Sequence, residues 1–249
     1  MPSLREIIDY CDTRLDIRAF DDYCPNGLQV EAGASVRRIV TGVTACLALI
    51  EAARDVEADL LLVHHGYFWK GEPQPLTGMK GKRVRELFAA GMSMAAYHLP
   101  LDAHPELGNN VRLGRLLGFA GAAAVTQDGL LWGAELSVTL EAEELRQRLC
   151  ELTGREALLL SGGAHPVKRV AWCTGGAQSW LSKAADQGYD AFITGEASEA
   201  SFHIARERNI HFYSAGHHAT ERHGIQALGE ELSERFGVRH EYIDIPNPV

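Results

Sequence analysis

Two adjacent histidines in the first half of the chain have the type and position of residues that do chemistry. His64 and His65 directly follow four aliphatic residues, Leu60 to Val63, and precede Gly66. An uninterrupted apolar run is typical of a parallel strand covered on both faces, and ligands bind beyond the carboxyl ends of such strands. Successive side chains of an extended chain point in opposite directions, so the two imidazoles can face two partners. The pair therefore suits a two-metal site. The pair alone leaves an alternative open, in which one histidine caps the strand and the other is a solvated loop residue.

Two further groups combine a histidine with a carboxylate. His98 and Asp102 come directly after a predicted strand, at what should be the same sheet edge as the histidine pair. His217 and Glu221 are four residues apart, and they share one helix face if residues 216–221 form the first turn of the last predicted helix. Both groups therefore place an imidazole and a carboxylate within reach of one or two metal ions.

The predicted metal site contains only nitrogen and oxygen donors. Three imidazoles and two carboxylates suit zinc, iron, manganese or nickel, without selecting one of them. Two four-coordinate ions need about eight ligand positions, and this set fills roughly seven if both carboxylates bridge. The open position favours a hydrolytic centre that acts through a metal-bound hydroxide over a closed structural site. The predicted ligands are His64, His65, Asp102, His217 and Glu221.

Other polar residues near strand ends are candidates for supporting roles. His98, His104 and Glu196 could each hold a ligand in place or carry a proton, or be structural or solvated residues. His218 and His223 flank the predicted ligands and are interpreted as surface residues or outer partners. Among these residues, we assign proton transfer or support of a metal ligand to His98 and Glu196.

Two loops carry weaker signals. The pair Gly175-Gly176 could cradle a phosphate at a helix N-terminus, but without a complete fingerprint a plain turn is the favoured interpretation. The loop over residues 67–78 holds Phe68 and Trp69 just past the histidine pair. These aromatic side chains either wall a ligand pocket or cover the edge of the sheet.

The candidate residues are positioned by alternating strands and helices. Ser3 and Glu6 form a capping box that begins a helix over residues 3–15. Strands over 39–43 and 59–63 enclose a helix over about 45–56, which is a βαβ unit. Further strands are predicted at 92–97, 130–138, 157–160, 170–173, 190–194, 210–215 and 239–243, and further helices at 81–90, 109–118, 141–152, 179–187, 197–206 and 220–236.

The two halves of the chain share a pattern. Aligning them without a gap pairs polar residues at corresponding strand ends, and a second offset pairs the two His-x-x-x-carboxylate groups. We therefore predict an α/β fold of two similar lobes that arose by internal duplication, with the metal site in the cleft between them. The aligned pairs are 37–40 with 168–171, Asp59 with Asp190, Val63 with Thr194, His65 with Glu196, and His98-x-x-x-Asp102 with His217-x-x-x-Glu221.

A stretch of small residues over 121–126 is linker-like and suggests where the lobes divide. We predict an N-terminal α/β lobe over residues 1–122, which carries the first three predicted ligands. A C-terminal α/β lobe over residues 123–249 carries the other two.

Composition narrows the class of protein. The 249 residues carry a formal net charge of −9, which argues against a nucleic-acid partner held mainly through its phosphates. The five cysteines are scattered and form no C-x-x-C pair, so core thiols in a reducing compartment are expected. There is no apolar leader and no run of 18 apolar residues, so we expect a cytoplasmic protein without a membrane segment.

Together, the motifs resemble those of the Nif-three-like dinuclear metal-centre proteins, whose bacterial members are labelled GTP cyclohydrolase 1 type 2 homologues. The resemblance runs from about residue 4 to residue 245. It implies two lobes of three-layer sandwich type, a toroidal homo-hexamer, and two divalent metal ions per chain on the five predicted ligands. By this resemblance, the chain is expected to be of the short type, without the inserted domain of longer members. The matching motifs are Asn26-Gly27-Leu28-Gln29-Val30, His64-His65-Gly66, His98-Leu99-Pro100-Leu101-Asp102, Thr194-Gly195-Glu196 and Gly216-His217-His218-Ala219-Thr220-Glu221.

Three functional hypotheses follow. The first is a dinuclear-metal-dependent hydrolase acting on a nucleotide-like, purine-type or other small substrate; the family label implies attack on the imidazole ring of a purine. The second is a non-catalytic metal-binding ring that stores or delivers metal or acts as a scaffold, because no substrate signature is recognisable. The third, a ring that encircles nucleic acid, is disfavoured by the acidic composition.

Overall fold

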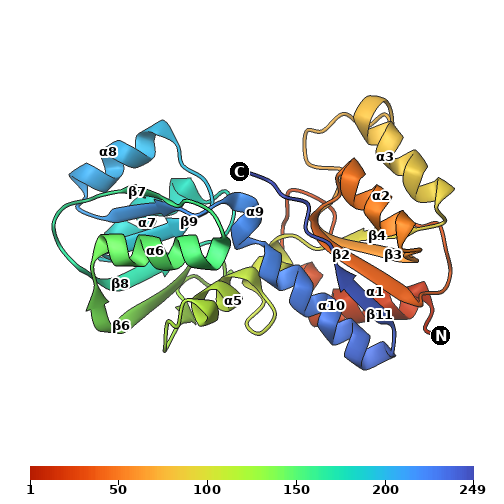
Figure 1. Ribbon diagram of the computed structural model, residues 1–249, viewed down its shortest axis with the longest axis horizontal. Coiled ribbons are helices and arrows are strands. Elements are labelled where there is room, and N and C mark those ends of the chain that lie inside the picture. Colours follow the sequence, from red (N-terminus) through yellow and green to blue (C-terminus); the bar gives the residue numbers. More distant parts are fainter. The chain divides into compact units, whose positions relative to one another are not determined.

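A computed structural model describes residues 1–249 and shows an α/β chain with two compact units (Figure 1). The first unit comprises Met1–Leu101 and Gly224–Pro246, and the second comprises Asp102–His223 and Asn247–Val249. Each unit has its own sheet and its own apolar core. The predicted α/β class is confirmed. No helix has the length and apolar character that crossing a membrane requires.

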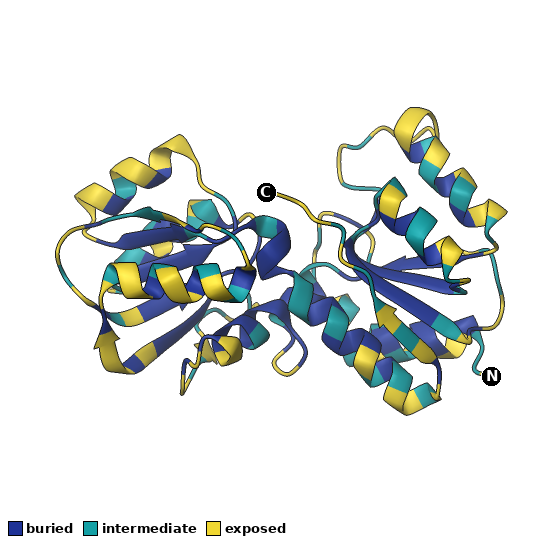
Figure 2. Ribbon diagram, in the orientation of Figure 1, coloured by how far each residue is buried: buried dark blue, intermediate teal, exposed yellow.

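The first unit is built on a five-stranded sheet in the order β1-β4-β3-β2-β11. All neighbours are parallel except β1, which is antiparallel to β4. Leu60 to Val63 are fully buried, because helices cover both faces of the sheet (Figures 1 and 2), and this explains their uninterrupted apolar run. The elements are α1 (Leu4–Arg14), η1 (Ile17–Ala19), β1 (Gly27–Val30), β2 (Arg38–Thr44), α2 (Leu47–Asp55), β3 (Leu60–His65), α3 (Gly78–Ala89), β4 (Ser93–Ala96), α10 (Arg222–Phe236) and β11 (Arg239–Tyr242).

The second unit has a six-stranded sheet in the order β5-β6-β8-β9-β10-β7. The three strands β8, β9 and β10 are parallel, and the outer strands are antiparallel to their neighbours. Val170 and Trp172 of β8 enter one core cluster, while Ala171 enters another, so both faces of this sheet are covered. The elements are α4 (Leu99–Ala103), which spans the division between the units, α5 (Asn109–Leu116), β5 (Ala123–Ala124), β6 (Trp132–Leu140), α6 (Ala142–Thr153), β7 (Leu158–Leu160), β8 (Val167–Trp172), η2 (Gln178–Trp180), α7 (Leu181–Asp186), β9 (Ala191–Thr194), α8 (Glu199–Glu207), β10 (His211–Ser214) and α9 (His217–Thr220).

The aligned positions of the two halves make matching hydrogen bonds. The Asp59 carboxylate accepts two backbone N–H groups at the start of β2, and the Asp190 carboxylate accepts two at the start of β8. The Arg38 side chain donates to the carbonyl of Val56. At the aligned positions, Arg169 donates to the carbonyl of Gln187 at 3.1 Å. These correspondences support the inference that the halves arose by duplication.

The units divide at a different place from the predicted boundary at residue 122. Residues 102–122 lie in the second unit, because Val111 and Leu113 of α5 pack into its core and the Trp172 indole donates to the Asn110 carbonyl at 2.9 Å. The chain also returns to the first unit, where β11 pairs with β2. The small residues Ala123 and Ala124 do not form a linker but pair with β6.

Candidate functional site

Three histidines come together at the carboxyl ends of β3 and β4 in the first unit. His64 and His65 end β3, and His98 follows β4. The ring centroids of His64 and His65 are 4.6 Å apart, and that of His98 lies 5.2 and 5.7 Å from them. One ligand atom from each residue lies within 4.8 Å of the others. His98 is therefore as close to the pair as a further ligand or a proton carrier would need to be.

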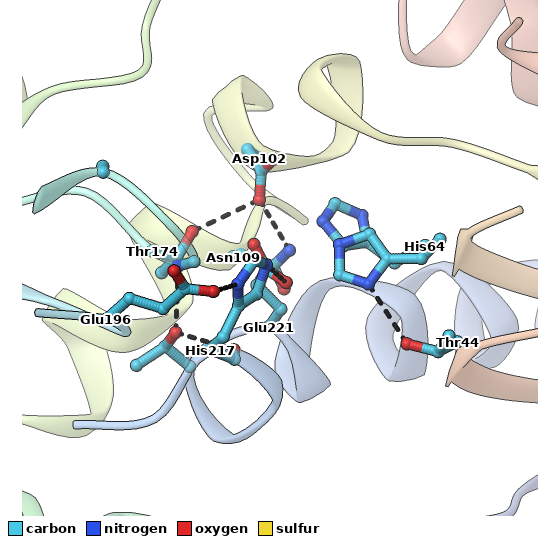
Figure 3. Close-up of polar contacts among 12 residues, drawn as sticks. Thr44, His64, Asp102, Asn109, Thr174, Glu196, His217 and Glu221 are labelled. Carbon is cyan, nitrogen blue, oxygen red and sulfur yellow. Dashed lines mark hydrogen bonds and ion pairs between the residues drawn. The ribbon is translucent and has the colours of Figure 1, made fainter. Parts of the chain in front are cut away.

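Four candidate histidines have the Nδ1 atom held by an oxygen of the protein. A carbonyl or carboxylate oxygen can only accept, so in three of these contacts Nδ1 carries the proton. The neutral ring then has its lone pair on Nε2, which is the arrangement that metal-binding histidines use. The contacts are His64 with the Tyr97 carbonyl oxygen (2.8 Å), His65 with Thr44 Oγ1 (3.1 Å), His98 with Asp22 Oδ1 (2.8 Å) and His217 with Glu196 Oε1 (2.6 Å; Figure 3).

Asp22 is a site residue that the sequence did not reveal. Its buried carboxylate accepts hydrogen bonds from His98 Nδ1, from the Asn26 side chain at 2.8 Å and from the Leu99 backbone at 3.0 Å. Burial alone would raise the pKa of Asp22, but the hydrogen bonds that the carboxylate accepts, first of all from His98, outweigh burial and lower the pKa. Asn26 also accepts the backbone N–H of His98 at 2.7 Å. The Asp22-to-Asn26 loop therefore fixes both the position and the protonated nitrogen of His98.

In the second unit, His217 lies between two carboxylates. Its Nε2 is 3.1 Å from Glu221 Oε2, and its Nδ1 donates to Glu196, which follows β9. The predicted single helix over residues 216–221 and beyond is wrong in detail: α9 is a separate short helix, and Glu221 lies between it and α10. The four-residue spacing still brings His217 and Glu221 together. The Glu196 carboxylate thus contacts the side of the His217 ring opposite to Glu221.

Asp102 is a buried carboxylate of the second unit. Its Oδ1 accepts hydrogen bonds from the Asn109 side chain at 2.8 Å and from Thr174 Oγ1 at 3.2 Å (Figure 3). Its backbone carbonyl accepts the Asn110 side chain at 3.2 Å. A carboxylate that is only 5% exposed needs such partners, because burial of an uncompensated charge is costly. The Asn109 and Thr174 donors orient the Asp102 carboxylate, and a carboxylate oxygen is a suitable ligand for a divalent cation.

Gly175 allows Glu221 to approach the end of β8. It has a φ of +71°, and a Cβ there would lie 2.0 Å from Glu221 Oε1 and 3.2 Å from His217 Nε2. The Gly175 N–H donates to Thr220 Oγ1 at 3.0 Å. The glycine pair after β8 thus forms a turn whose lack of a side chain at Gly175 leaves space for the candidate ligands.

We expect Gly175→Ala to weaken metal binding about tenfold or more, because the new methyl group must displace Glu221. Gly118→Ala is the matched control: Gly118 has a φ of +72°, but nothing lies within 4 Å of the position that a methyl group would take there. Both variants should lose about 1 kcal/mol of stability from the left-handed backbone. Elemental analysis measures the metal per chain, and equal metal contents in the two variants would contradict the assignment.

Protonation of His217 should oppose metal binding. Burial alone would lower the pKa of His217, but Glu221 and Glu196 raise it from 6.5 to about 9. Metal-free His217 is therefore protonated at pH 7 and must lose its proton to bind an ion. In the metal-free protein, this raised pKa stabilises the fold fully below pH 6.5, and the contribution is lost as the pH rises through about 9.

We therefore expect metal binding at pH 7 to release about one proton per chain from His217, and metal affinity to rise with pH up to about 9. Calorimetric titration in buffers of different ionisation enthalpy counts the released protons. His217→Ala should release about one proton fewer at the same pH. Equal proton release by the wild type and this variant would show that His217 is not the source.

The remaining predicted histidines have structural environments. His104 is buried, and its Nδ1 accepts the backbone N–H groups of Glu106 and Leu107 at 3.1 and 3.0 Å, so it holds a turn. His218 is also buried, and its backbone N–H donates to the Val249 carbonyl oxygen at 3.1 Å. Burial and two neighbouring arginines lower the pKa of His223 to about 4. None of these three belongs to the two groups described above.

Comparison with known proteins gives the family. The family described as Duf34/NIF3 (NGG1p interacting factor 3) matches residues 2–248. The chain belongs to this family. A relative from Allochromatium vinosum, named GTP cyclohydrolase 1 type 2 homolog, is 50% identical over 250 residues, covering 100% of this chain and 98% of the relative.

Two solved structures share the fold of this chain. The protein ybgI, described as of unknown function, is 47% identical with a TM-score of 0.94, and the match covers 100% of both chains. The protein TTHA1606 from Thermus thermophilus is 36% identical with a TM-score of 0.92, again over 100% of both chains. The resemblance inferred from the motifs is therefore confirmed.

Proposed function

We propose that this Duf34/NIF3 protein is a metal-dependent hydrolase with two divalent ions per chain. The observation that carries the proposal is the common orientation of four histidines, each with Nδ1 held by a protein oxygen. Three of the four are proposed metal ligands, which need this orientation, and the fourth, His98, needs it to accept a proton on Nε2. Zinc, iron, manganese and nickel all suit the donor set.

The proposed ligands are five side chains. His64 and His65 come from the first unit, and Asp102, His217 and Glu221 come from the second. When bound, the ions would act as Lewis acids and lower the pKa of water, which provides a nucleophile at neutral pH. Asp102 and Glu221 are buried carboxylates whose negative charge would balance the ions.

The remaining chemistry belongs to His98 and Glu196. Asp22 holds the proton of His98 on Nδ1, so Nε2 is free to accept a proton from water or substrate. Glu196 holds Nδ1 of His217 and keeps Nε2 directed toward the ligand position. His98 is thus the proposed base, and Glu196 is a positioning residue.

The substrate is proposed to be a nucleotide-like or other small molecule. Support comes from the relatives named GTP cyclohydrolase 1 type 2 homolog, whose name refers to a purine nucleotide. The test is a screen of the metal-loaded protein against nucleotides, phosphoesters, amides and cyclic amides. Turnover that depends on His98 would support a hydrolase. If nothing is turned over, a non-catalytic metal-binding ring replaces this proposal.

We also propose a homo-hexamer in the cytoplasm, as the family resemblance implies. The five cysteines are free, which fits a reducing compartment. Light scattering after size-exclusion chromatography tests the assembly, and a mass near that of a single chain, 27.3 kDa, would overturn it.

A further inference from the structure

An aromatic group lies beside the histidine cluster of the first unit and takes no part in the proposed metal binding. The Trp69 ring centroid lies 4.9 Å from that of His98, at an interplanar angle of 81°, and 5.9 Å from that of His65. The ring centroid of Tyr23 is 6.5 Å from that of His98. Two aromatic side chains therefore adjoin the residue proposed to accept a proton.

The turn that carries Trp69 is held in an uncommon conformation. Phe68 has a φ of +66°, a left-handed backbone that a bulky residue rarely adopts. The Glu72 carboxylate accepts the backbone N–H groups of Phe68 and Trp69 at 2.7 and 3.2 Å. The indole Nε1 donates to the Gly66 carbonyl at 3.2 Å. Strain of this kind persists where the surroundings enforce it and is concentrated at ligand sites.

The surroundings of this turn are also fixed. The Tyr67 N–H donates to Gln29 Oε1 at 2.7 Å, and Gln29 belongs to the motif that begins at Asn26. The Lys70 N–H donates to the Tyr23 carbonyl at 2.6 Å, which ties the two aromatic loops together. The rings are therefore presented by a rigid frame, and little ordering would be needed to bind a ligand.

These aromatic rings are accessible to a ligand. Tyr23 is 62% exposed, and Trp69 is partly exposed. Accessible aromatic rings next to convergent polar groups are typical of small-molecule sites, and indole and phenol rings stack on flat unsaturated rings. Covering a sheet edge would need neither the exposed Tyr23 ring nor a fixed indole.

We propose that Trp69 and Tyr23 form a stacking surface for a planar, nitrogen-containing aromatic ring of the substrate. The ring would lie next to His98, within reach of its Nε2. This inference rests on the proposed function, since it names a chemical class of substrate for the same centre. It assigns substrate specificity to the two loops that carry Trp69 and Tyr23, neither of which provides a proposed metal ligand.

The test uses calorimetric titration of the metal-loaded protein with three probes. Guanosine 5′-monophosphate and uridine 5′-monophosphate contain a flat ring, and ribose 5-phosphate is their ring-free counterpart. We expect the wild type to bind at least one of the two nucleotides more tightly than ribose 5-phosphate. Trp69→Ala should weaken nucleotide binding roughly ten- to hundredfold, and Trp69→Phe should weaken it less, because a smaller ring remains.

Matched variants keep this test interpretable. Trp180→Phe is the control, because Trp180 is a partly buried tryptophan of η2 that packs under Lys183 and should leave nucleotide binding unchanged. Tyr23→Ala changes a largely exposed side chain, so this variant should fold. It should also weaken nucleotide binding, and it therefore tests the proposal even if Trp69→Ala does not fold.

Metal content, measured for every variant, separates the two proposals. Wild-type protein without metal counts against the proposed function. Metal-loaded wild type that binds neither nucleotide, or binds ribose 5-phosphate equally well, overturns the stacking proposal alone. So does unchanged nucleotide affinity in Trp69→Ala. A change of oligomeric state in that variant, with nucleotide affinity unchanged, would instead place Trp69 at a contact between copies.

Discussion

The double variant His217→Ala, Glu221→Ala is expected to lose most of its metal, whereas the wild type should hold about two ions per chain. His217 Nε2 lies 3.1 Å from Glu221 Oε2, and Glu221 is buried next to Gly175. Changing an outer partner of a metal ligand typically costs about 10- to 100-fold in metal affinity, so removing two ligands should cost more. The double variant His64→Ala, His65→Ala, which removes the two proposed ligands of the first unit, should also lose most of its metal.

A matched control exists on α8. His203 and Glu207 have the same four-residue spacing on a helix, but both are exposed and belong to neither candidate group. The double variant His203→Ala, Glu207→Ala should therefore keep its metal. Elemental analysis after reconstitution with zinc, iron, manganese or nickel measures all variants, and circular dichroism checks their fold. If the wild type binds none of these ions, the inference from the adjacent histidines is wrong.

The strand ends were predictable because their signal is local. A buried parallel strand must be apolar along its length, so the change from Val63 to His64 marks the point where β3 leaves the core. The same reasoning located His98 after β4 and Glu196 after β9. The matching bonds of Asp59 and Asp190 likewise follow from a sequence repeat that needs no structure to be recognised.

The partners of the histidines were not predictable in the same way. Asp22 is 76 residues from His98, and its loop contains only turn signals. Thr174, which contacts Asp102 from 72 residues away, follows β8 without any distinguishing pattern. Such contacts depend on how loops from different strands meet at one sheet edge. Sequence spacing does not contain that information.

The boundary of the units shows a second limit. Small residues at 121–126 resemble a linker, but Ala123 and Ala124 extend the edge of a sheet. The real division follows Leu101, in the short helix α4, where no composition change occurs. Packing of α5 against Trp172 places α5 in the second unit. The indole fits against Gly114, where a side chain would clash.

Replacing the buried Asp22 by asparagine should lower turnover by about 10²- to 10⁴-fold without loss of metal, the range that proton transfer by a positioned side chain contributes. The substitution would place an amide where the carboxylate accepts several N–H groups, so His98 would lose its fixed proton on Nδ1. Asp21→Asn, at the exposed neighbouring position, is the control and should retain full turnover.

The double variant Asp22→Asn, His98→Ala decides whether Asp22 acts through His98. If it does, the double variant should turn over substrate no more slowly than His98→Ala alone, because residues that act as a unit are not additive. The measurement is kcat for the substrate found in the screen, with metal content determined in parallel. Additive losses, or loss of metal from Asp22→Asn, would instead make Asp22 a residue of the fold, with His98 positioned by other means.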